Sequence, residues 1–488
     1  MSADASAGNR IAETHTGLVF LVGEWAYKVK KPVVTDFLDF SRVESREAAC
    51  AHEVTLNRRL SPGSYLGVGH FAAPGGGAPE PVIVMRRHPD RCRLATLVRS
   101  GADVTADLTA IARLLAGFHD GAARGPAIDA QAQPDAVAAR WADNIAELRR
   151  YAAGVVPGLD GADIDAIEER VSAFISGRSA LFGDRIARQR IVDGHADLLA
   201  DDIFCLPDGP ALLDCLEFDD RLRYVDVIDD VAFLAMDLEF LGRPDLADFL
   251  LARYTEFSGD RAPQSLRHFY VAYRAVVRAK VDCVRHTQGD PDAAAHARHH
   301  LAIASEHLRR GAVRLILVGG EPGTGKTTLA RALAERLGAQ VISTDDVRAE
   351  LLARGEIKGT AGVLGEGLYA PANVAAVYRT VLRHADRALC EGHTVILDGT
   401  WTDPGHRGSA RDVASQVFAP VTELVCVAPL DRTVDRIRTR SSTTSQVTPE
   451  IAAALAARES RTWPQAHRID TTRPPAESVA EAMDLCLG

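Results

Sequence analysis

The residues of this chain best suited to chemistry form a glycine-rich run that ends in lysine and threonine. An apolar segment, residues 315–318, precedes the run and a helical pattern follows it, which is the strand-loop-helix setting of a phosphate-binding loop. Glycines there let the backbone aim its N–H groups at phosphate oxygens. Lys326 would reach the β and γ phosphates of ATP or GTP, and Thr327 would hold Mg²⁺. The residues of the run are Gly320, Glu321, Pro322, Gly323, Thr324, Gly325, Lys326 and Thr327, with Thr328 next.

Two strand ends beyond this loop carry residues that phosphoryl transfer needs. The strand predicted over 340–343 leads to Asp345 and Arg348, at the carboxyl edge of the sheet where open α/β folds bind ligands. Asp345 can accept a proton from an attacking hydroxyl, and Arg348, one helical turn on, can hold the acceptor or its charge. The alternative is a helix-capping aspartate beside a solvated arginine. The strand predicted over 394–397 delivers Asp398, which could support Mg²⁺ through water.

Arginines crowd a helical segment farther along the chain. Arg436 and Arg440 lie four residues apart and therefore share one helix face. Such arginines can close over the transferring phosphoryl group and neutralise charge as it spreads. A solvated, charged surface is the alternative interpretation.

Strands and helices alternate beyond residue 311, which predicts a parallel sheet with helices on both faces. With its phosphate loop, S-T-D-D-x-x-R, the D-G-T strand end and the arginines, this part resembles the small P-loop kinases. Their relatives include gluconate kinase, polynucleotide 5′-hydroxyl kinase, chloramphenicol phosphotransferase and the zeta toxins. The resemblance implies that Asp345 activates the hydroxyl, Arg348 faces the acceptor and Asp398 takes the Walker-B-like position. It does not choose the acceptor.

A second acidic loop lies between two short β runs in the first part of the chain. His195, Asp197 and Asp202 have the spacing H-x-D-x-x-x-x-D, and Asp214 ends the strand that follows. Asp197 could orient or deprotonate a hydroxyl, and Asp202 could bind a metal ion. Asp214 could bridge Mg²⁺ to the nucleotide phosphates.

This loop resembles that of the aminoglycoside phosphotransferase and choline kinase-like superfamily, which reads H-G-D-x-x-x-x-N. The resemblance implies a two-lobed, protein-kinase-like fold in which a small-lobe lysine contacts phosphate and pairs with a glutamate on the next helix. Lys28 and Lys30 share a strand face and are both candidates for the lysine, with Lys28 favoured. Glu53 is the candidate glutamate. Exposed strand lysines at a sheet edge are the alternative interpretation.

Two residues depart from the superfamily pattern. Ala196 replaces the loop glycine and constrains the backbone, and Asp202 replaces the asparagine and adds negative charge beside Asp197 and Asp214. The run D-V-I-D-D-V-A, residues 226–232, resembles the helix-start aspartate of these enzymes. The runs K-K-P-V, F-L-D-F-S and N-R-R-L-S-P, residues 30–33, 37–41 and 57–62, resemble a branch of the superfamily that is found fused to a P-loop kinase.

We therefore expect an α/β and α+β protein with two domains. Residues 1–310 form the kinase-like domain, with a small lobe over about 1–88, and residues 311–488 form the P-loop kinase domain. No apolar run approaches the ~20 residues of a membrane span, and residues 1–10 lack the pattern of a secretory signal. We expect a cytoplasmic protein. Its eight scattered cysteines contain no C-x-x-C pair and predict buried thiols.

The expected function is transfer of a phosphoryl group from ATP, with Mg²⁺, to a hydroxyl of a small metabolite. A sugar, an aminoglycoside-like compound or a nucleoside would suit, and both modules would be of the kinase type. One alternative is a P-loop kinase regulated by a catalytically weak kinase-like sensor, which Asp202 motivates. Another is polynucleotide 5′-hydroxyl kinase activity in the C-terminal module. Its 20 Lys and Arg against 21 Asp and Glu over 311–488 argue against a nucleic-acid partner.

Overall fold

The computed structural model describes residues 10–13, 17–33, 39–72, 78–360, 365–439 and 463–487. The chain divides into two compact units. Unit 1 comprises Met1–Gly161, Arg185–Ala262 and Tyr270–Ala304, and unit 2 comprises Ala162–Asp184, Pro263–Phe269 and Ser305–Gly488. Unit 2 therefore includes two segments that precede the predicted boundary near Gly311. The division into domains 1–310 and 311–488 stays a prediction.

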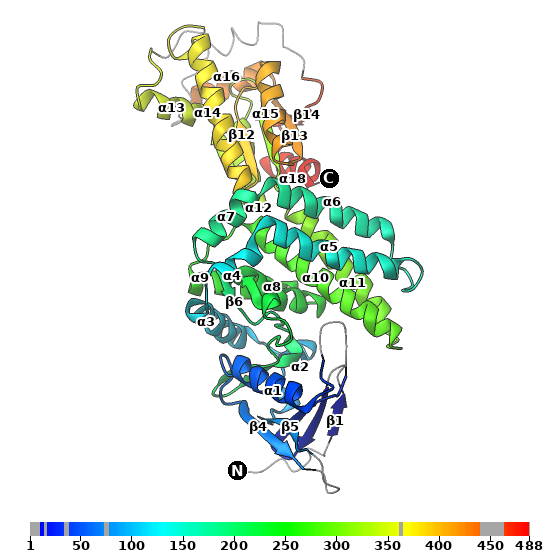
Figure 1. Ribbon diagram of the computed structural model, residues 1–488. Helices are drawn as coiled ribbons and strands as arrows, with labels where there is room; N and C mark the ends of the chain where they lie inside the picture. The colour runs from blue at the N-terminus through cyan, green and yellow to red at the C-terminus, as the bar shows by residue number, and fades with distance from the viewer. Residues whose placement is uncertain are drawn as a thin grey trace. The chain divides into compact units, whose positions relative to one another are not determined.

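Unit 1 begins with a small lobe built on an antiparallel sheet in the order β1-β2-β3-β5-β4 (Figure 1). One face of this sheet packs against helix α1 (Val43–Asn57) around the buried side chains of Ala26, Val54 and Ile83. Strand β4 could not be predicted from the sequence, because Gly67 and Gly69 interrupt its strand pattern. The strands are β1 (Arg10–Glu13), β2 (Gly17–Val22), β3 (Trp25–Lys30), β4 (Tyr65–Phe71) and β5 (Glu80–Arg86).

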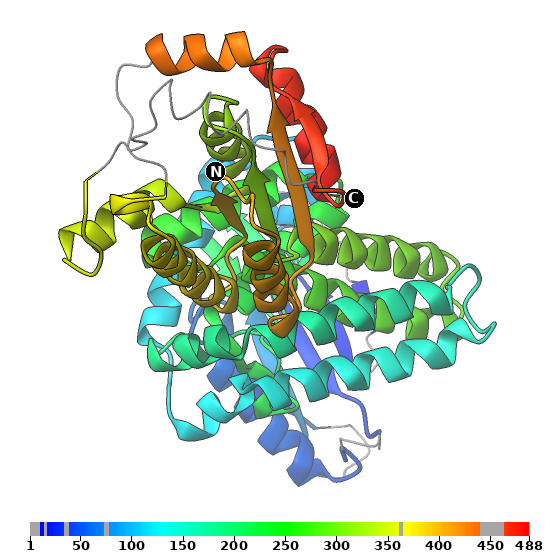
Figure 2. The same cartoon turned by 90° about the horizontal axis from the view of Figure 1, so that it is seen from above.

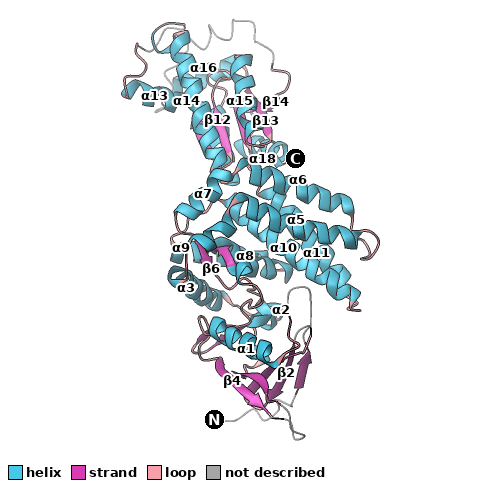
Figure 3. Cartoon of the chain, in the orientation of Figure 1, coloured by secondary structure: helices cyan, strands magenta, loops and turns pink. Residues whose placement is uncertain are grey.

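The large lobe of unit 1 is mainly helical (Figure 3). It contains two short antiparallel pairs, β6 with β9 and β7 with β8. The acidic loop runs between β6 and β7, and the β7–β8 hairpin leads to Asp214. The bounds are η1 (Asp90–Cys92), α2 (Leu94–Arg99), α3 (Thr105–Gly121), α4 (Pro126–Asp129), η2 (Ala130–Ala132), α5 (Pro134–Ala152), β6 (Ile191–Asp193), η3 (Ala200–Asp202), β7 (Ile203–Leu206), β8 (Gly209–Leu212), η4 (Asp220–Arg223), β9 (Tyr224–Asp226), α8 (Val227–Phe240), α9 (Pro244–Ser258), α10 (Gln264–Thr287) and α11 (Ala293–Arg310). The start of α10, residues 264–269, and the end of α11, residues 305–310, belong to unit 2.

The core of unit 2 is a parallel sheet in the order β11-β12-β10-β13-β14. Its central strand β10 is apolar and buried along its whole length, as a parallel strand covered on both faces must be. Helices α12 and α18 pack on one face, and α14 and α15 lie on the other (Figure 2). The strands are β10 (Leu315–Gly319), β11 (Gln340–Ser343), β12 (Val395–Asp398), β13 (Val421–Val427) and β14 (His467–Asp470).

The helices of unit 2 comprise those that connect these strands, α18 after the last strand, and α6 and α7, which precede the sheet in the sequence. They are α6 (Gly161–Gly177), α7 (Ser179–Ala187), α12 (Lys326–Leu337), α13 (Thr344–Ala353), η5 (Gly367–Tyr369), α14 (Pro371–Cys390), α15 (Pro404–Gln416), α16 (Leu430–Thr439) and α18 (Pro475–Leu487).

Both parts of the fold prediction are confirmed. Unit 1 has the two-lobed arrangement of a protein-kinase-like fold, in which a small sheet with one packed helix is followed by a helical lobe that carries the acidic loop. Unit 2 is a P-loop NTPase fold, since the glycine-rich run joins β10 to α12 in a parallel sheet covered on both faces. Among the described residues, no helix combines the length and apolar character needed to cross a membrane.

The junction of α6 and α7 is packed closely against the end of α15. The Arg178 guanidinium donates through Nη1 to the carbonyl of Val417, the C-cap residue of α15. A cation at this position is favourable because the carbonyl end of a helix carries partial negative charge. Burial lowers the pKa of Arg178 to about 10. A Cβ atom at Gly177 would lie 2.1 Å from the same carbonyl oxygen, so this junction admits only glycine.

We therefore expect Gly177→Ala to destabilise unit 2. The added methyl group must displace backbone, which costs about 1–3 kcal/mol of unfolding free energy. Gly183→Ala is the matched control, because a Cβ atom at Gly183 would meet nothing within 4 Å and alanine favours a helix by up to about 1 kcal/mol. Urea unfolding of the full chain measures both variants. Equal stability of the two variants would contradict the packing described.

Candidate functional site

A buried carboxylate holds the backbone of the acidic loop in unit 1. Asp230, in the first turn of α8, accepts the His195 N–H on Oδ2 and the Ala196 N–H on Oδ1, each at 2.7 Å. His119 Nε2 lies 3.1 Å from Oδ2. Burial would raise the pKa of Asp230, but hydrogen bonds and charge from His119 and contact with His195 bring it below the usual range. The resemblance pointed to an aspartate at this helix start, and the residue that binds the loop is Asp230.

The loop takes a left-handed turn at Ala196, where the superfamily has glycine. Its φ is +67°, a conformation that costs an alanine about 1 kcal/mol. The Asp230 carboxylate on the Ala196 N–H and the Arg274 guanidinium on the Ala196 carbonyl, at 3.2 Å, hold this conformation. The constraint expected from Ala196 is therefore present, and the surrounding contacts impose the turn that a glycine would otherwise allow.

Asp197 follows this turn in a strongly perturbed environment. Burial raises the pKa of Asp197 to about 7, with the positive charge of Arg278 opposing and the negative charge of Asp214 reinforcing the shift. Burial lowers the pKa of His195 to about 4, so the imidazole is neutral near pH 7. A carboxyl group whose pKa lies near the working pH suits the acceptance of a proton from a hydroxyl.

The pKa values of Asp202 and Asp214 are shifted in opposite directions, although the two carboxyl groups are close enough to interact. Burial raises the pKa of Asp202, and the negative charges of Asp214 and Asp197 add to the effect. The pKa of Asp214 is lowered, chiefly by the charge of Lys28. Excess negative charge of this kind fits a divalent cation. No group of three His, Cys, Asp or Glu side chains among the described residues could hold a metal ion by itself, so Mg²⁺ there would also need nucleotide phosphates as ligands.

Glu53 on α1 pairs with both candidate lysines. Lys28 Nζ lies 2.8 Å from Glu53 Oε1, and Lys30 Nζ lies 2.6 Å from Glu53 Oε2. Lys28 also reaches Asp214 Oδ1 at 2.7 Å, whereas Lys30 pairs with Glu217. Lys28 is therefore the lysine nearest to the candidate metal-binding aspartate.

The glycine-rich run of unit 2 forms a tight loop before α12. Lys326 is the first residue of that helix, and its Nζ donates to the carbonyl of Glu321 at 2.9 Å. Gly323 has a φ of +81°, and a Cβ atom there would lie 2.6 Å from the Thr433 carbonyl. Thr471 donates to the Thr324 carbonyl at 2.6 Å and supports the loop from the end of β14.

Thr327 and Asp398 meet beneath this loop. Thr327 Oγ1 donates to Asp398 Oδ2 at 2.7 Å. Burial raises the pKa of Asp398, while the Thr327 hydrogen bond and the charge of Lys326 oppose the shift. A hydroxyl on a carboxylate at the start of the helix is the arrangement in which P-loop enzymes hold Mg²⁺, so these two residues could hold it here.

Asp345 and Arg348 form an ion pair on α13, next to the end of β11. Arg348 Nη1 lies 2.5 Å from Asp345 Oδ1, and the guanidinium carbon lies 4.7 Å from the centre of the Tyr369 ring. The side chain that caps α13 is Ser343, which accepts the Asp345 N–H. The Asp345 carboxylate is therefore not needed as the helix cap.

Aromatic residues that the sequence analysis did not identify surround this pair. The Tyr378 ring stacks on His406 with centres 3.9 Å apart, and its hydroxyl lies 3.3 Å from Thr400 Oγ1 and accepts the Trp401 N–H at 3.3 Å. The charge of Arg348 influences the pKa of Tyr378, which burial raises. These residues come from α14, from the segment after β12 and from α15, and no sequence spacing links them to Asp345.

The structure places one of the two arginines that were predicted to close over the phosphoryl group. Arg436, on α16, donates to the Thr471 carbonyl at 2.7 Å and approaches the Gly323 carbonyl at 3.5 Å. It thus contacts the backbone around the phosphate loop. Arg440 lies outside the described residues.

The fold and these two sites define the class of protein. It joins a module with a two-lobed, protein-kinase-like fold to a P-loop module, as the sequence predicted. A family model described as an AAA domain matches residues 315–461, which include the phosphate loop, Asp345 and Asp398. The match indicates a nucleotide-binding module of the kinase or phosphotransferase type.

The chain belongs to the same family as a protein of Mycobacterium tuberculosis (strain ATCC 25618 / H37Rv) named Uncharacterized protein Rv2004c. The two are 57% identical over 472 residues, which cover 97% of this chain and 94% of that protein. A protein of Methanococcus vannielii named 2-phosphoglycerate kinase is 36% identical over 118 residues, which cover 19% of this chain and 37% of that protein. A solved choline/ethanolamine kinase family protein from Mesorhizobium loti is 15% identical, covers 63% of this chain and 90% of its own, and has a TM-score of 0.39.

We expect Arg278→Gln to raise the pKa of Asp197 above its value of about 7. Arg278 lies one turn beyond Arg274 on α10, and its positive charge lowers the pKa of Asp197, so its removal favours the protonated carboxyl. Carbon NMR of labelled aspartate carboxyls in the full chain, assigned with Asp197→Asn, measures the titration.

Arg285→Gln is the control, because Arg285 lies on the same helix but faces Asp282, at 3.9 Å. An equal shift in both variants would rule out a specific effect of Arg278.

The folded chain holds a proton on Asp197 that the unfolded chain releases between about pH 4 and pH 7. The contribution of Asp197 to stability therefore falls as pH rises through this window and is level above it.

Proposed function

We propose that this chain is an ATP- and Mg²⁺-dependent phosphotransferase that acts on a hydroxyl of a small metabolite through two kinase-type modules. The observation that carries the proposal is the contact between Thr327 and Asp398 at 2.7 Å beneath the phosphate loop, with Asp345 on the neighbouring strand end. Asp345 influences the pKa of Asp398, so the carboxylate proposed to take the hydroxyl proton acts close to the phosphate site. A switch or motor would not need that carboxylate. A cytoplasmic location is part of the same proposal.

In the proposed reaction, Lys326 leaves the Glu321 carbonyl and binds the β and γ phosphates. Asp345 orients the acceptor hydroxyl and takes its proton as the oxygen bonds to the γ phosphorus and the bond to ADP breaks. Mg²⁺, when bound with the nucleotide, neutralises charge on the phosphate oxygens. Arg436, already bonded around the loop, adds positive charge nearby.

The surroundings of Arg348 support an acceptor that carries an anionic group beside its hydroxyl. The Arg348 Nη1 pairs with Asp345, and the guanidinium plane lies over the Tyr369 ring. The Arg348 Nε is buried and has no hydrogen-bond partner among the described residues. A carboxylate or phosphate oxygen would satisfy that donor, and guanidinium binds such groups with paired hydrogen bonds. The 118-residue similarity to proteins named 2-phosphoglycerate kinase is consistent with such an acceptor.

A second candidate function makes unit 1 a sensor that controls the P-loop module. Lys28 is bonded to Asp214, and Asp202 has a raised pKa, so the site lacks the charge balance of an asparagine-containing loop. Binding of MgATP to the full chain with Lys326→Ala separates the two functions. Metal-dependent binding of ATP to the Lys326→Ala variant supports two kinase modules. No binding of ATP to this variant supports the sensor.

The central experiment is a screen of metabolites for acceptor-dependent ATP consumption. We expect at least one hydroxyl compound to stimulate the wild-type chain, and Lys326→Ala to lose the part that depends on unit 2. Asp197→Ala should lose the part that depends on unit 1. Phosphoryl transfer that is unchanged in both variants would overturn the proposal.

With an acceptor identified, Arg348→Gln should raise its KM by about 10-fold to 100-fold, because charge-assisted hydrogen bonds contribute about 1.5–3 kcal/mol. The KM for MgATP should change little. Arg354→Gln is the matched control at the C-cap of the same helix, since the Arg354 side chain is 60% exposed and pairs with Glu350. An acceptor KM that is unchanged in Arg348→Gln would exclude an anionic group bound by Arg348.

A further inference from the structure

The last residue of α1 and the residues after it make more polar contacts around the acidic loop of unit 1 than their sequence suggests. We call residues 57–65 the clamp segment. It contains the run N-R-R-L-S-P. Four of its side chains bond to residues around the acidic loop or the strand end that carries Asp214.

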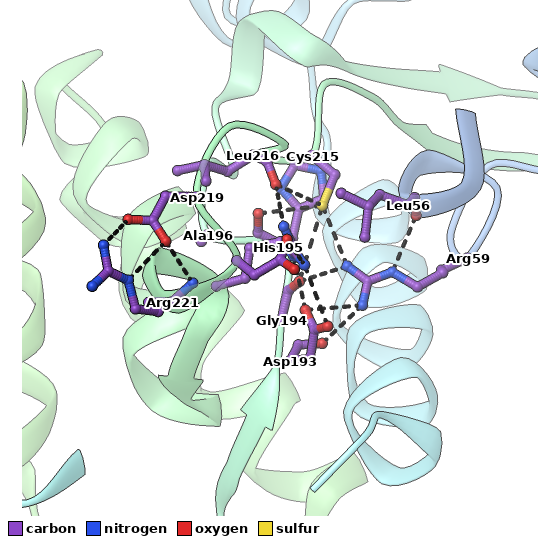
Figure 4. Close-up of polar contacts among 12 residues, drawn as sticks. Leu56, Arg59, Asp193, Gly194, His195, Ala196, Cys215, Leu216, Asp219 and Arg221 are labelled. Atoms are coloured by element: carbon purple, nitrogen blue, oxygen red, sulfur yellow. Dashed lines mark hydrogen bonds and ion pairs between the residues drawn. The ribbon is translucent and has the colours of Figure 1, made fainter. Parts of the chain in front are cut away.

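Arg59 is the centre of these contacts (Figure 4). Its Nη1 donates to the Asp193 carbonyl at 3.0 Å and its Nη2 to the Gly194 carbonyl at 2.7 Å, directly before His195. Nη2 also lies 3.3 Å from Cys215 Sγ, on the residue after Asp214. One planar guanidinium therefore holds both stretches of chain that supply the candidate catalytic and metal-binding aspartates.

Asn57 joins the Glu53 turn of α1 to the same strand end. The Asn57 side chain is buried, donates to the Glu53 carbonyl at 2.9 Å and accepts the Cys215 N–H at 2.9 Å. Ser61 and Tyr65 add further bonds: Ser61 Oγ donates to the Leu212 carbonyl at 2.7 Å, and the Tyr65 hydroxyl accepts the Asp214 N–H at 3.2 Å.

These bonds close a ring around the candidate nucleotide site. Lys28 binds Glu53 and Asp214, and Asn57 links the Glu53 turn to Cys215, which is covalently next to Asp214. Each buried donor in the ring has a defined acceptor, so displacement of α1 would leave several buried polar groups unpaired, each at a cost of about 1–3 kcal/mol. Helix α1 is therefore fixed relative to the aspartates.

We propose that the clamp segment positions the acidic loop and the Asp214 strand end against α1, with Arg59 as its central positioning residue. This role rests on the proposed nucleotide binding by unit 1. Arg59 acts through the backbone, because it binds the Asp193 and Gly194 carbonyls and the Cys215 sulfur and so positions the chain on which Asp197 and Asp214 lie. The kinase-like site is thus assembled without a swing of the helix that carries Glu53.

Arg58 provides a matched control at the neighbouring position. Its Nε donates to the Tyr65 carbonyl at 2.8 Å and its Nη2 to the Leu66 carbonyl, both within the small lobe. Arg58→Ala and Arg59→Ala remove equal side chains from the same helix end. Only the second removes bonds to the acidic loop.

Amide hydrogen exchange of the full chain tests the positioning role without any need for catalytic activity. In Arg59→Ala we expect exchange at His195, Ala196 and Cys215 to accelerate by about 10-fold or more, with the β-sheet of unit 2 unchanged. In Arg58→Ala these three amides should keep their wild-type rates. Arg59→Lys, which keeps the charge but cannot bind two carbonyls at once, should fold and still show the local acceleration, so the test survives if Arg59→Ala does not fold.

The second measurement is calorimetric titration of MgATP into the same variants with Lys326→Ala present. Arg59→Ala and Arg59→Lys should weaken binding by about 10-fold, as substitutions behind ligand-holding residues do, and Arg58→Ala should not. Uniform faster exchange across unit 1, or equal effects of the two arginines, would overturn the positioning role. Local acceleration without any MgATP binding by the parent chain would retain the clamp and reject nucleotide binding by unit 1.

Discussion

The candidate active site of unit 1 depends on one buried carboxylate. Asp230 accepts two successive backbone N–H groups, those of His195 and Ala196, and so fixes the loop from which Asp197 projects. A charged acceptor for both donors at 2.7 Å is strong enough to hold a left-handed alanine. Arg274 completes the arrangement on the opposite side, since it binds the Ala196 carbonyl and the neighbouring Asp229. The loop geometry of a kinase-like fold is thus preserved without its glycine.

The two sites differ in how they are assembled. In unit 2 the phosphate-binding groups are consecutive residues, and their backbone N–H groups are aimed by the turn itself. In unit 1 the groups come from β3, α1, the acidic loop and the β8 strand end, so the site exists only when several elements are packed together. This explains the density of buried polar contacts around the acidic loop, where each element must be held in register with the others.

The same difference decides what could be predicted from the sequence. The phosphate loop, Asp345 and Asp398 could be predicted because each lies at the end of a recognisable strand. The strands of the two five-stranded sheets could be recognised from apolar runs, except β1, β4 and β14. Asp230 was indicated only as one of several aspartates at a helix start. The contacts of Arg59, Asn57 and Tyr378 could not be predicted, because their partners lie far away in the sequence and no local pattern encodes the packing that joins them. The pairing of Glu53 with both Lys28 and Lys30 could not be predicted either, because it depends on the positions of the side chains in the folded sheet.

That shared carboxylate has a consequence for how the site tolerates mutation. A buried glutamate left without a cation would be strongly destabilising, by about 3–5 kcal/mol. Here either lysine alone keeps Glu53 compensated, because each occupies a different carboxylate oxygen. Loss of one lysine can therefore alter chemistry while the charge balance of the small lobe survives. Because each lysine pairs with its own Glu53 oxygen, substitution of one of them leaves the other ion pair in place.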